Sequence, residues 1–243
     1  MEKEMKNEKS KKKVFFTEGR IELITAIFLG ITALTTAWAT WIGSLHGGNQ
    51  ATNYTMSNNL ASEGNSMYNE AAQYVMSDLM IWNDINDLSI EYTFALENGD
   101  ETTAEKCEWK LEQIMTDNCT DEFLEAINWA LDQEEYVTPF EYQYEDGTYY
   151  LDTYYADALD TLAEAEDLLE QGKLDNAHGD AFGLVTVIYS IVLFLLGIVG
   201  IFKNIPNRKL VLIIAIVAFL VATIYMFTIP MPTGFNFASY FQN

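Results

Sequence analysis

The chain has 243 residues and carries 36 acidic side chains against 13 lysines and arginines, which gives a formal net charge of −23 at pH 7. A surface this negative repels nucleic acid, so no nucleic-acid partner is expected. With two cysteines and two histidines, the sequence also has no Cys/His cluster with the spacing of a zinc site.

Three apolar stretches interrupt the charged sequence, at residues 21–44, 182–202 and 210–229. A helix needs about 20 apolar residues to cross a hydrocarbon core that is about 30 Å thick. Soluble helices of this length normally keep a polar face. The pattern predicts an all-α membrane protein with three transmembrane helices in contact with a lipid bilayer. A large helical extracytoplasmic domain is inserted between the first and the second of them.

The cationic residues predict the orientation. Segment 1–20 is rich in lysine, and the short loop 203–209 contains three cations and no acid. Positive residues in short loops stay cytoplasmic. We therefore expect 1–20 and 203–209 in the cytoplasm, and 45–181 and the aromatic tail 230–243 on the outer side. A cleaved signal peptide is the alternative for the N-terminus, but 21–44 exceeds the roughly 7–15 apolar residues usual there.

The first apolar stretch carries a stripe of hydroxyl side chains at steps of seven or four residues, formed by Thr25, Thr32, Thr36, Thr40 and Ser44. Two interpretations remain open. In the first, the hydroxyls bond to neighbouring helices or to their own backbone, and the stripe packs inside the protein. In the second, several copies of this helix line a pore. Three helices alone cannot enclose a pore, so the second interpretation requires a homo-oligomer.

The segment between the first two apolar stretches is strongly acidic. Residues 47–181 contain 31 acidic side chains against three lysines, a formal charge of −28. The segment also contains many aromatic and aliphatic residues, so it can fold around a core of its own. The charge attracts cations, either to a solvated surface or to a site for divalent metal ions, but no particular metal ligands can be named.

The pattern of this segment predicts helices separated by turns. We expect a stalk helix over 49–65, interrupted near Gly47-Gly48, and a helix over 66–97. A turn at 98–100 precedes a helix over 103–116, opened by a capping box at Thr102 and Glu105. A third helix begins at Thr120, and a hairpin or ordered loop covers 137–150. A fourth helix covers 151–171, ends at Gly172, and is followed by a cap at Asp175 or Asp180.

Cys107 and Cys119 are the only cysteines, and both lie in the acidic segment. An extracytoplasmic location permits a disulfide between them. The alternative is two buried free thiols.

No set of residues indicates catalysis. The sequence has no glycine-rich phosphate loop and no Ser/His/Asp set, and on so acidic a surface any pair of carboxylates resembles an acid–base pair. The chain is therefore expected not to be an enzyme, and no cofactor is predicted.

The membrane segments and their flanks resemble a family of uncharacterised three-pass prokaryotic membrane proteins. The similarity is carried by the first hydroxyl-rich helix, by residues 48–53 (GNQATN) and by residues 175–184 (DNAHGDAFGL). The acidic insert and residues 66–70 depart from the family pattern. The resemblance implies the three-pass topology and the plasma membrane of a prokaryote, and it implies no activity.

Two functions follow as hypotheses. The first is a homo-oligomeric assembly that conducts or concentrates cations. The second is a scaffold or sensor of the cell envelope that binds a partner through its acidic outer domain. A channel needs the hydroxyl stripe to face water, whereas a scaffold needs it packed in the interior.

Overall fold

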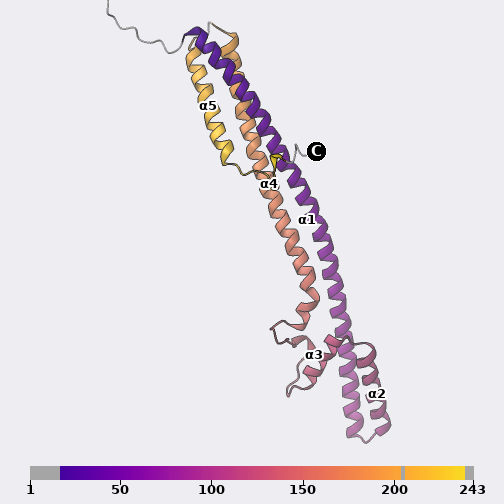
Figure 1. Cartoon of the computed structure of the whole chain (residues 1–243). Helices are drawn as coiled ribbons and strands as arrows, with labels where there is room; N and C mark the ends of the chain where they lie inside the picture. Colours follow the sequence, from indigo (N-terminus) through magenta and orange to yellow (C-terminus); the bar gives the residue numbers. More distant parts are fainter. Residues whose placement is uncertain (1–16, 204–205, 239–243) are drawn as a thin grey trace, which may run out of the picture. The chain divides into compact units, whose positions relative to one another are not determined.

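The structure is a computed structural model that describes residues 17–203 and 206–238 (Figure 1). Most of the predicted cytoplasmic segment 1–20, two residues of the loop 203–209 and the end of the tail 230–243 lie outside these ranges. The described residues form five α-helices and one short 3-10 helix, and no sheet: α1 Glu18–Glu97, α2 Glu101–Asp117, α3 Asp121–Leu131, η1 Pro139–Glu141, α4 Tyr150–Ile201 and α5 Arg208–Thr228. The all-α prediction is confirmed.

Three helices of the described chain are long and apolar enough to cross a membrane, namely α1, α4 and α5. This confirms the number of predicted spans. Their exact limits at 21–44, 182–202 and 210–229, and those of the outer domain at 45–181, stay predictions.

The chain divides into two compact units. We call residues 1–54 and 170–243 the span unit, and residues 55–169 the insert unit. Helices α1 and α4 contribute to both units, whereas α5 belongs to the span unit and α2 and α3 belong to the insert unit.

The core of the span unit follows a seven-residue repeat. Buried side chains on α4 and α5 recur at alternating steps of three and four, as Phe182, Val185, Tyr189, Val192, Leu196 and Val199, and as Leu212, Ala215, Phe219, Ala222 and Met226. On α1, the buried positions are Ile21, Thr25, Thr32, Ala39, Ile42 and His46. A 3.5-residue period keeps one seam of each helix against its neighbours, as in a coiled coil.

The core of the insert unit joins its helices around aromatic side chains. Trp82 and Ile85 of α1 pack with Phe123 and Ile127 of α3 and with Tyr150 at the start of α4. The rings of Phe123 and Tyr150 stack with centroids 5.7 Å apart. This packing fixes the first turn of α4 against α1, and the candidate site lies beside it.

Several predicted helix ends are wrong. Helix α1 continues through Gly47-Gly48 without interruption, and α4 continues through Gly172, Asp175 and Asp180, so neither aspartate is a cap. Helix α2 begins at Glu101, because the carboxylate of Asp100 accepts the N–H of Thr103 (3.1 Å) and caps the helix in place of the predicted box at Thr102.

Two predicted turns and one cap are confirmed. Gly99 adopts a positive φ of 69° between α1 and α2, a conformation that favours glycine. Asp146-Gly147 closes a tight turn in an ordered loop, where Gln143 and Tyr149 form a single antiparallel bridge. Thr120 caps α3 by accepting the N–H of Phe123 at 3.1 Å.

Candidate functional site

The predicted hydroxyl stripe is divided between the interior and the surface of the span unit. Thr25 and Thr32 are buried, Thr36 is half-buried, and Thr40 and Ser44 are exposed. The hydroxyls of Thr25, Thr36 and Thr40 donate to the carbonyl four residues earlier, at 2.7–2.9 Å. These bonds within the helix are the ones that threonines make when they pack in membrane helices.

The two cysteines are free thiols in the structure, Cys107 buried and Cys119 half-buried. The disulfide between them is not formed there and stays a prediction. Burial, with a smaller contribution from the charge of Asp78, raises the pKa of the Cys119 thiol. A raised pKa lowers the thiolate fraction at neutral pH, so Cys119 is expected to react slowly with alkylating reagents.

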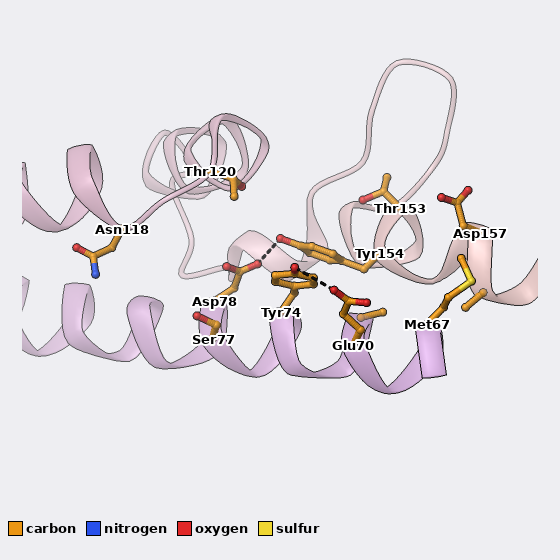
Figure 2. Close-up of a pocket in the computed structure, with 12 residues that line it drawn as sticks. Met67, Glu70, Tyr74, Ser77, Asp78, Asn118, Thr120, Thr153, Tyr154 and Asp157 are labelled. Atoms are coloured by element: carbon orange, nitrogen blue, oxygen red, sulfur yellow. Dashed lines mark hydrogen bonds between the residues drawn. The ribbon is translucent and has the colours of Figure 1, made fainter. Parts of the chain in front are cut away.

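A pocket of about 580 Å³ opens in the insert unit between α1, the α2–α3 connection and the first turns of α4 (Figure 2). Asp78 and Tyr154 lie at its centre, and Tyr74 stands beside them. The carboxylates of Glu70 and Asp157 line the same pocket from α1 and α4. Among the described residues, no lysine or arginine lines it.

Asp78 is a buried carboxylate held by two phenols. Its Oδ2 accepts hydrogen bonds from the hydroxyls of Tyr150 and Tyr154, each at 2.7 Å, and its residue is 5% exposed. A buried carboxylate without partners would be strongly destabilising, and these two charge-assisted bonds offset that. The arrangement holds the start of α4 against α1.

The spacing of Asp78 along α1 indicates that it is buried, but the apolar pattern of residues 66–97 predicts a different buried face. Tyr68 and Leu79 stand three residues before Ala71 and Trp82 in the pattern that predicts the helix over 66–97, but both are exposed. The buried face instead contains Ala71, Asp78, Trp82 and Ile85, which share the seven-residue spacing of the rest of α1. A carboxylate in register with a buried face requires a polar partner from another element.

The pocket rim combines aromatic rings with acidic groups. The rings of Tyr74 and Tyr154 are nearly parallel, with centroids 6.0 Å apart and an interplanar angle of 16°. The hydroxyl of Tyr74 donates to Glu70 at 3.3 Å. Aromatic faces and carboxylates together attract cations, and they favour organic cations, which interact with the ring face.

The phenols of the pocket resist ionisation. Burial, together with the hydrogen bond to Asp78 and its charge, raises the pKa of Tyr154 to about 12. Burial first, and then the bonds to Tyr154 and Asp78, also raise the pKa of Tyr150.

We predict a loss of stability at alkaline pH in the insert unit. A phenol whose pKa is higher in the folded than in the unfolded chain stabilises the fold fully below the unfolded value of about 10. That contribution disappears as the pH rises through the folded value near 12. Thermal unfolding of the full chain should therefore vary little up to about pH 9 and weaken steeply above pH 10. Tyr154→Phe should reduce this steep part, whereas Tyr136→Phe, at an exposed position, should leave it unchanged.

A second buried polar group lies in the span unit, near the outer end of the first predicted span, 21–44. His46 and Asp175 are each 1% exposed, and Nδ1 of His46 lies 2.9 Å from Oδ1 of Asp175. Nε2 of His46 faces the carbonyl oxygen of Pro230 at 3.1 Å, and the amide of Asn53 donates to Oδ2 of Asp175 at 3.0 Å. Both ring nitrogens of His46 therefore face acceptors.

Which atom donates between Nδ1 of His46 and Oδ1 of Asp175 depends on the tautomer of the ring. Both nitrogens form hydrogen bonds when the ring donates from Nδ1 and from Nε2, or when Asp175 donates to Nδ1 and the ring donates from Nε2 alone. In either case, one cluster links α1, α4 and the chain that follows α5. In the sequence, His46 stands two residues after the apolar stretch 21–44. Its partner lies 129 residues away, which no local pattern reveals.

The chain after α5 folds back on α1. Phe235 packs edge-on against Trp38 and Trp41, with ring centroids 6.3 Å and 5.9 Å apart. The amide of Asn49 donates to the carbonyl of Thr233 at 3.1 Å. Aromatic residues are enriched at membrane–water interfaces, so this aromatic cluster agrees with a span that ends near residue 44.

No group of three or more histidine, cysteine or acidic side chains in the described parts of the chain is arranged to hold a metal ion. The possible site for divalent metal ions therefore stays a prediction.

The fold and its sites are those of a helical protein with three candidate membrane spans. No family model, curated protein sequence or solved structure matches this chain, so the resemblance to uncharacterised three-pass membrane proteins stays a prediction.

Proposed function

We propose that this is a non-catalytic three-pass membrane protein whose insert unit binds a small organic cation, such as an alkylammonium ion, in the pocket around Asp78 and Tyr154. The observation that carries the proposal is the lining of that pocket, in which acidic side chains surround two stacked tyrosine rings. In this role the protein acts as a sensor, with the insert outside the cell and the segments 1–20 and 203–209 inside.

The charge of the chain supports a cationic ligand in two ways. Residues 47–181 carry a formal charge of −28, which raises the local concentration of cations and speeds their encounter with the surface. Within the pocket, Glu70 and Asp157 are exposed carboxylates, so they remain available to a ligand. Asp78 is already satisfied by its two phenols and keeps Tyr154 in position.

The burial of Thr25 and Thr32, two members of the hydroxyl stripe, favours the sensor over a channel. Thr25 and Thr32 pack within one span unit, where they cannot line an axis shared by several copies. Threonine hydroxyls bonded to their own helix are also less available to replace the water shell of an ion. A homo-oligomer belongs to the conducting alternative, and the proposed sensor does not depend on it.

Binding of tetramethylammonium to the full chain in detergent tests the proposal. Calorimetric titration should show saturable binding that sodium at equal ionic strength does not reproduce. Tyr74→Leu removes one ring and should weaken binding about two- to fivefold, the size of an exposed cation–π contact. The double variant Glu70→Gln with Asp157→Asn should weaken it about fivefold or more.

Glu112→Gln provides the matched control, because Glu112 is an exposed acid on α2 that does not line the pocket. It removes one acidic charge from the same unit, against two in the double variant, and should leave the affinity unchanged. The proposal fails if tetramethylammonium and sodium give equal heats, or if Glu112→Gln weakens binding as much as the pocket variants do.

A further inference from the structure

A second pocket, of about 410 Å³, lies in the span unit where α5 begins, at the end predicted to face the cytoplasm. Its lining contains three basic residues and one acid. It comes from the start of α1, residues near both ends of the α4–α5 connection and the first turn of α5: Glu18, Ile21, Lys203, Asn207, Arg208, Lys209 and Leu210. The proposed cation sensor makes no use of it.

Arg208 is the central feature of this pocket. The residue is only 5% exposed, and its Nε donates to the carbonyl of Val199 at 2.9 Å. Its Nη1 donates to Oε2 of Glu18. Its Nη2 is buried and has no hydrogen-bond partner among the residues that the structure describes. A buried donor on a charged group is normally bonded, so an unbonded one indicates a partner from outside the described chain.

The charges around Arg208 favour an anion. Lys203 and Lys209 are exposed cations in the same lining. The opposing carboxylates are Glu18 and Glu22, and Glu22 already pairs with Lys203 at 2.8 Å. Three cations therefore face two carboxylates, which leaves a net positive charge at the pocket.

The start of α5 adds to this field. Asn207 precedes the helix with a left-handed φ of 62° and makes no capping bond through its side chain. The 21-residue helix therefore presents the positive end of its dipole at the pocket, uncapped by a side chain, and such helix starts favour phosphate groups.

From the unbonded Nη2 of Arg208, a residue that lines this pocket, and from the two lysines beside it, we infer a binding site for a phosphate group, carried by an anionic lipid or by a soluble phosphate compound. The planar guanidinium donates through Nη2 to a phosphate oxygen, and the ammonium groups of Lys203 and Lys209 supply charge around it. Basic pockets between membrane helices on the cytoplasmic side bind anionic lipid headgroups in this way.

The test uses the full chain in a maltoside detergent, which contains no phosphate. Phosphatidylglycerol, phosphatidylcholine and inorganic phosphate are added separately, and the thermal unfolding midpoint and the lipid retained in native mass spectrometry are measured. Phosphatidylglycerol should raise the midpoint and remain bound. If inorganic phosphate also raises the midpoint, the site recognises the phosphate group itself. If only phosphatidylglycerol does so, the ligand is the lipid.

Substitutions in the pocket lining test whether phosphatidylglycerol binds at this pocket. Lys209→Gln should weaken binding of phosphatidylglycerol about three- to tenfold, the loss of one charge-assisted contact. Arg208→Gln should weaken binding further. If Arg208→Gln does not fold, the result for Lys209→Gln alone tests the inference. Arg20→Gln removes an equal charge from outside the pocket lining and should have little effect.

Three results would overturn the inference. One is that neither phosphatidylglycerol nor inorganic phosphate shifts the midpoint. Another is that phosphatidylcholine acts as strongly as phosphatidylglycerol, which would indicate general solvation by lipid. The last is that Arg20→Gln weakens binding as much as Lys209→Gln, which would indicate attraction to the whole basic end.

Discussion

Asp175→Ala is expected to destabilise the span unit by about 3–5 kcal/mol, because breaking a buried ion pair leaves its partner charged or unbonded in a nonpolar environment. His46 would keep its bond to the Pro230 carbonyl but would lose the acceptor at Nδ1. Asn53 would lose its acceptor as well. The measurement is thermal or denaturant unfolding of the full chain in detergent, followed by tryptophan fluorescence.

Asp180→Ala is the matched control on the same helix, since Asp180 is exposed. It should change stability by less than about 0.5 kcal/mol, as surface substitutions usually do. The double variant His46→Leu with Asp175→Leu removes both partners together and should recover much of the loss. A loss for Asp175→Ala no larger than that for Asp180→Ala would show that the cluster does not hold the helices together.

Gly64→Leu is expected to destabilise the insert unit by about 3 kcal/mol, the upper part of the usual range for overpacking a filled interior. A Cβ at Gly64 would lie 2.8 Å from Cγ of Leu162 and 3.2 Å from the carbonyl oxygen of Ala158. The carbonyl belongs to the α4 backbone and cannot move aside without shifting the helix.

Gly47→Leu is the comparison within α1, because nothing lies within 4 Å of a Cβ at Gly47. There, the substitution only replaces a poor helix former, so it should stabilise the chain by about 0.5–1 kcal/mol. The two variants should thus shift the unfolding midpoint in opposite directions. Equal shifts would mean that α1 and α4 do not approach closely at Gly64.

The features that the sequence predicted correctly depend on local chemistry. An apolar stretch of about 20 residues is itself the requirement for crossing a bilayer, so the number of candidate spans followed directly. Thr120 caps a helix with its own side chain, and Gly99 and Gly147 adopt backbone conformations that other residues rarely take. None of these features needs a partner from elsewhere in the chain.

The helix limits failed where tertiary packing outweighed local preference. A single glycine inside a helix costs about 1 kcal/mol relative to alanine, which the packing of a long helix readily offsets. Gly172 was expected to end a helix, but a Cβ there would lie 2.4 Å from the ring of Tyr54. The glycine is therefore explained by the close approach of α1 and α4 in the span unit.

The polar sites could not be predicted because their members are far apart in sequence. Asp78 meets Tyr150 and Tyr154 across 72 and 76 residues. Among 36 acidic residues, only burial distinguishes Asp78 and Asp175 from the solvated majority. Ile21, Thr25 and Thr32 lie on one helix face with the seven-residue spacing of the core. The sequence interpretation grouped the threonines by their hydroxyls and left out the apolar residues on that face.

The distance along the chain between His46 and its partners sets an order of events during biosynthesis. The ribosome makes Asp175 129 residues after His46 and Pro230 another 55 later. At roughly 5–20 residues per second, about 6 to 26 seconds pass between the synthesis of His46 in α1 and that of Asp175 in α4. During that interval Thr25 and Thr36 are satisfied by their own helix, whereas His46 has to remain hydrated at the membrane surface. Its engagement by Pro230 therefore comes among the last steps of assembly, after all three spans have been translated.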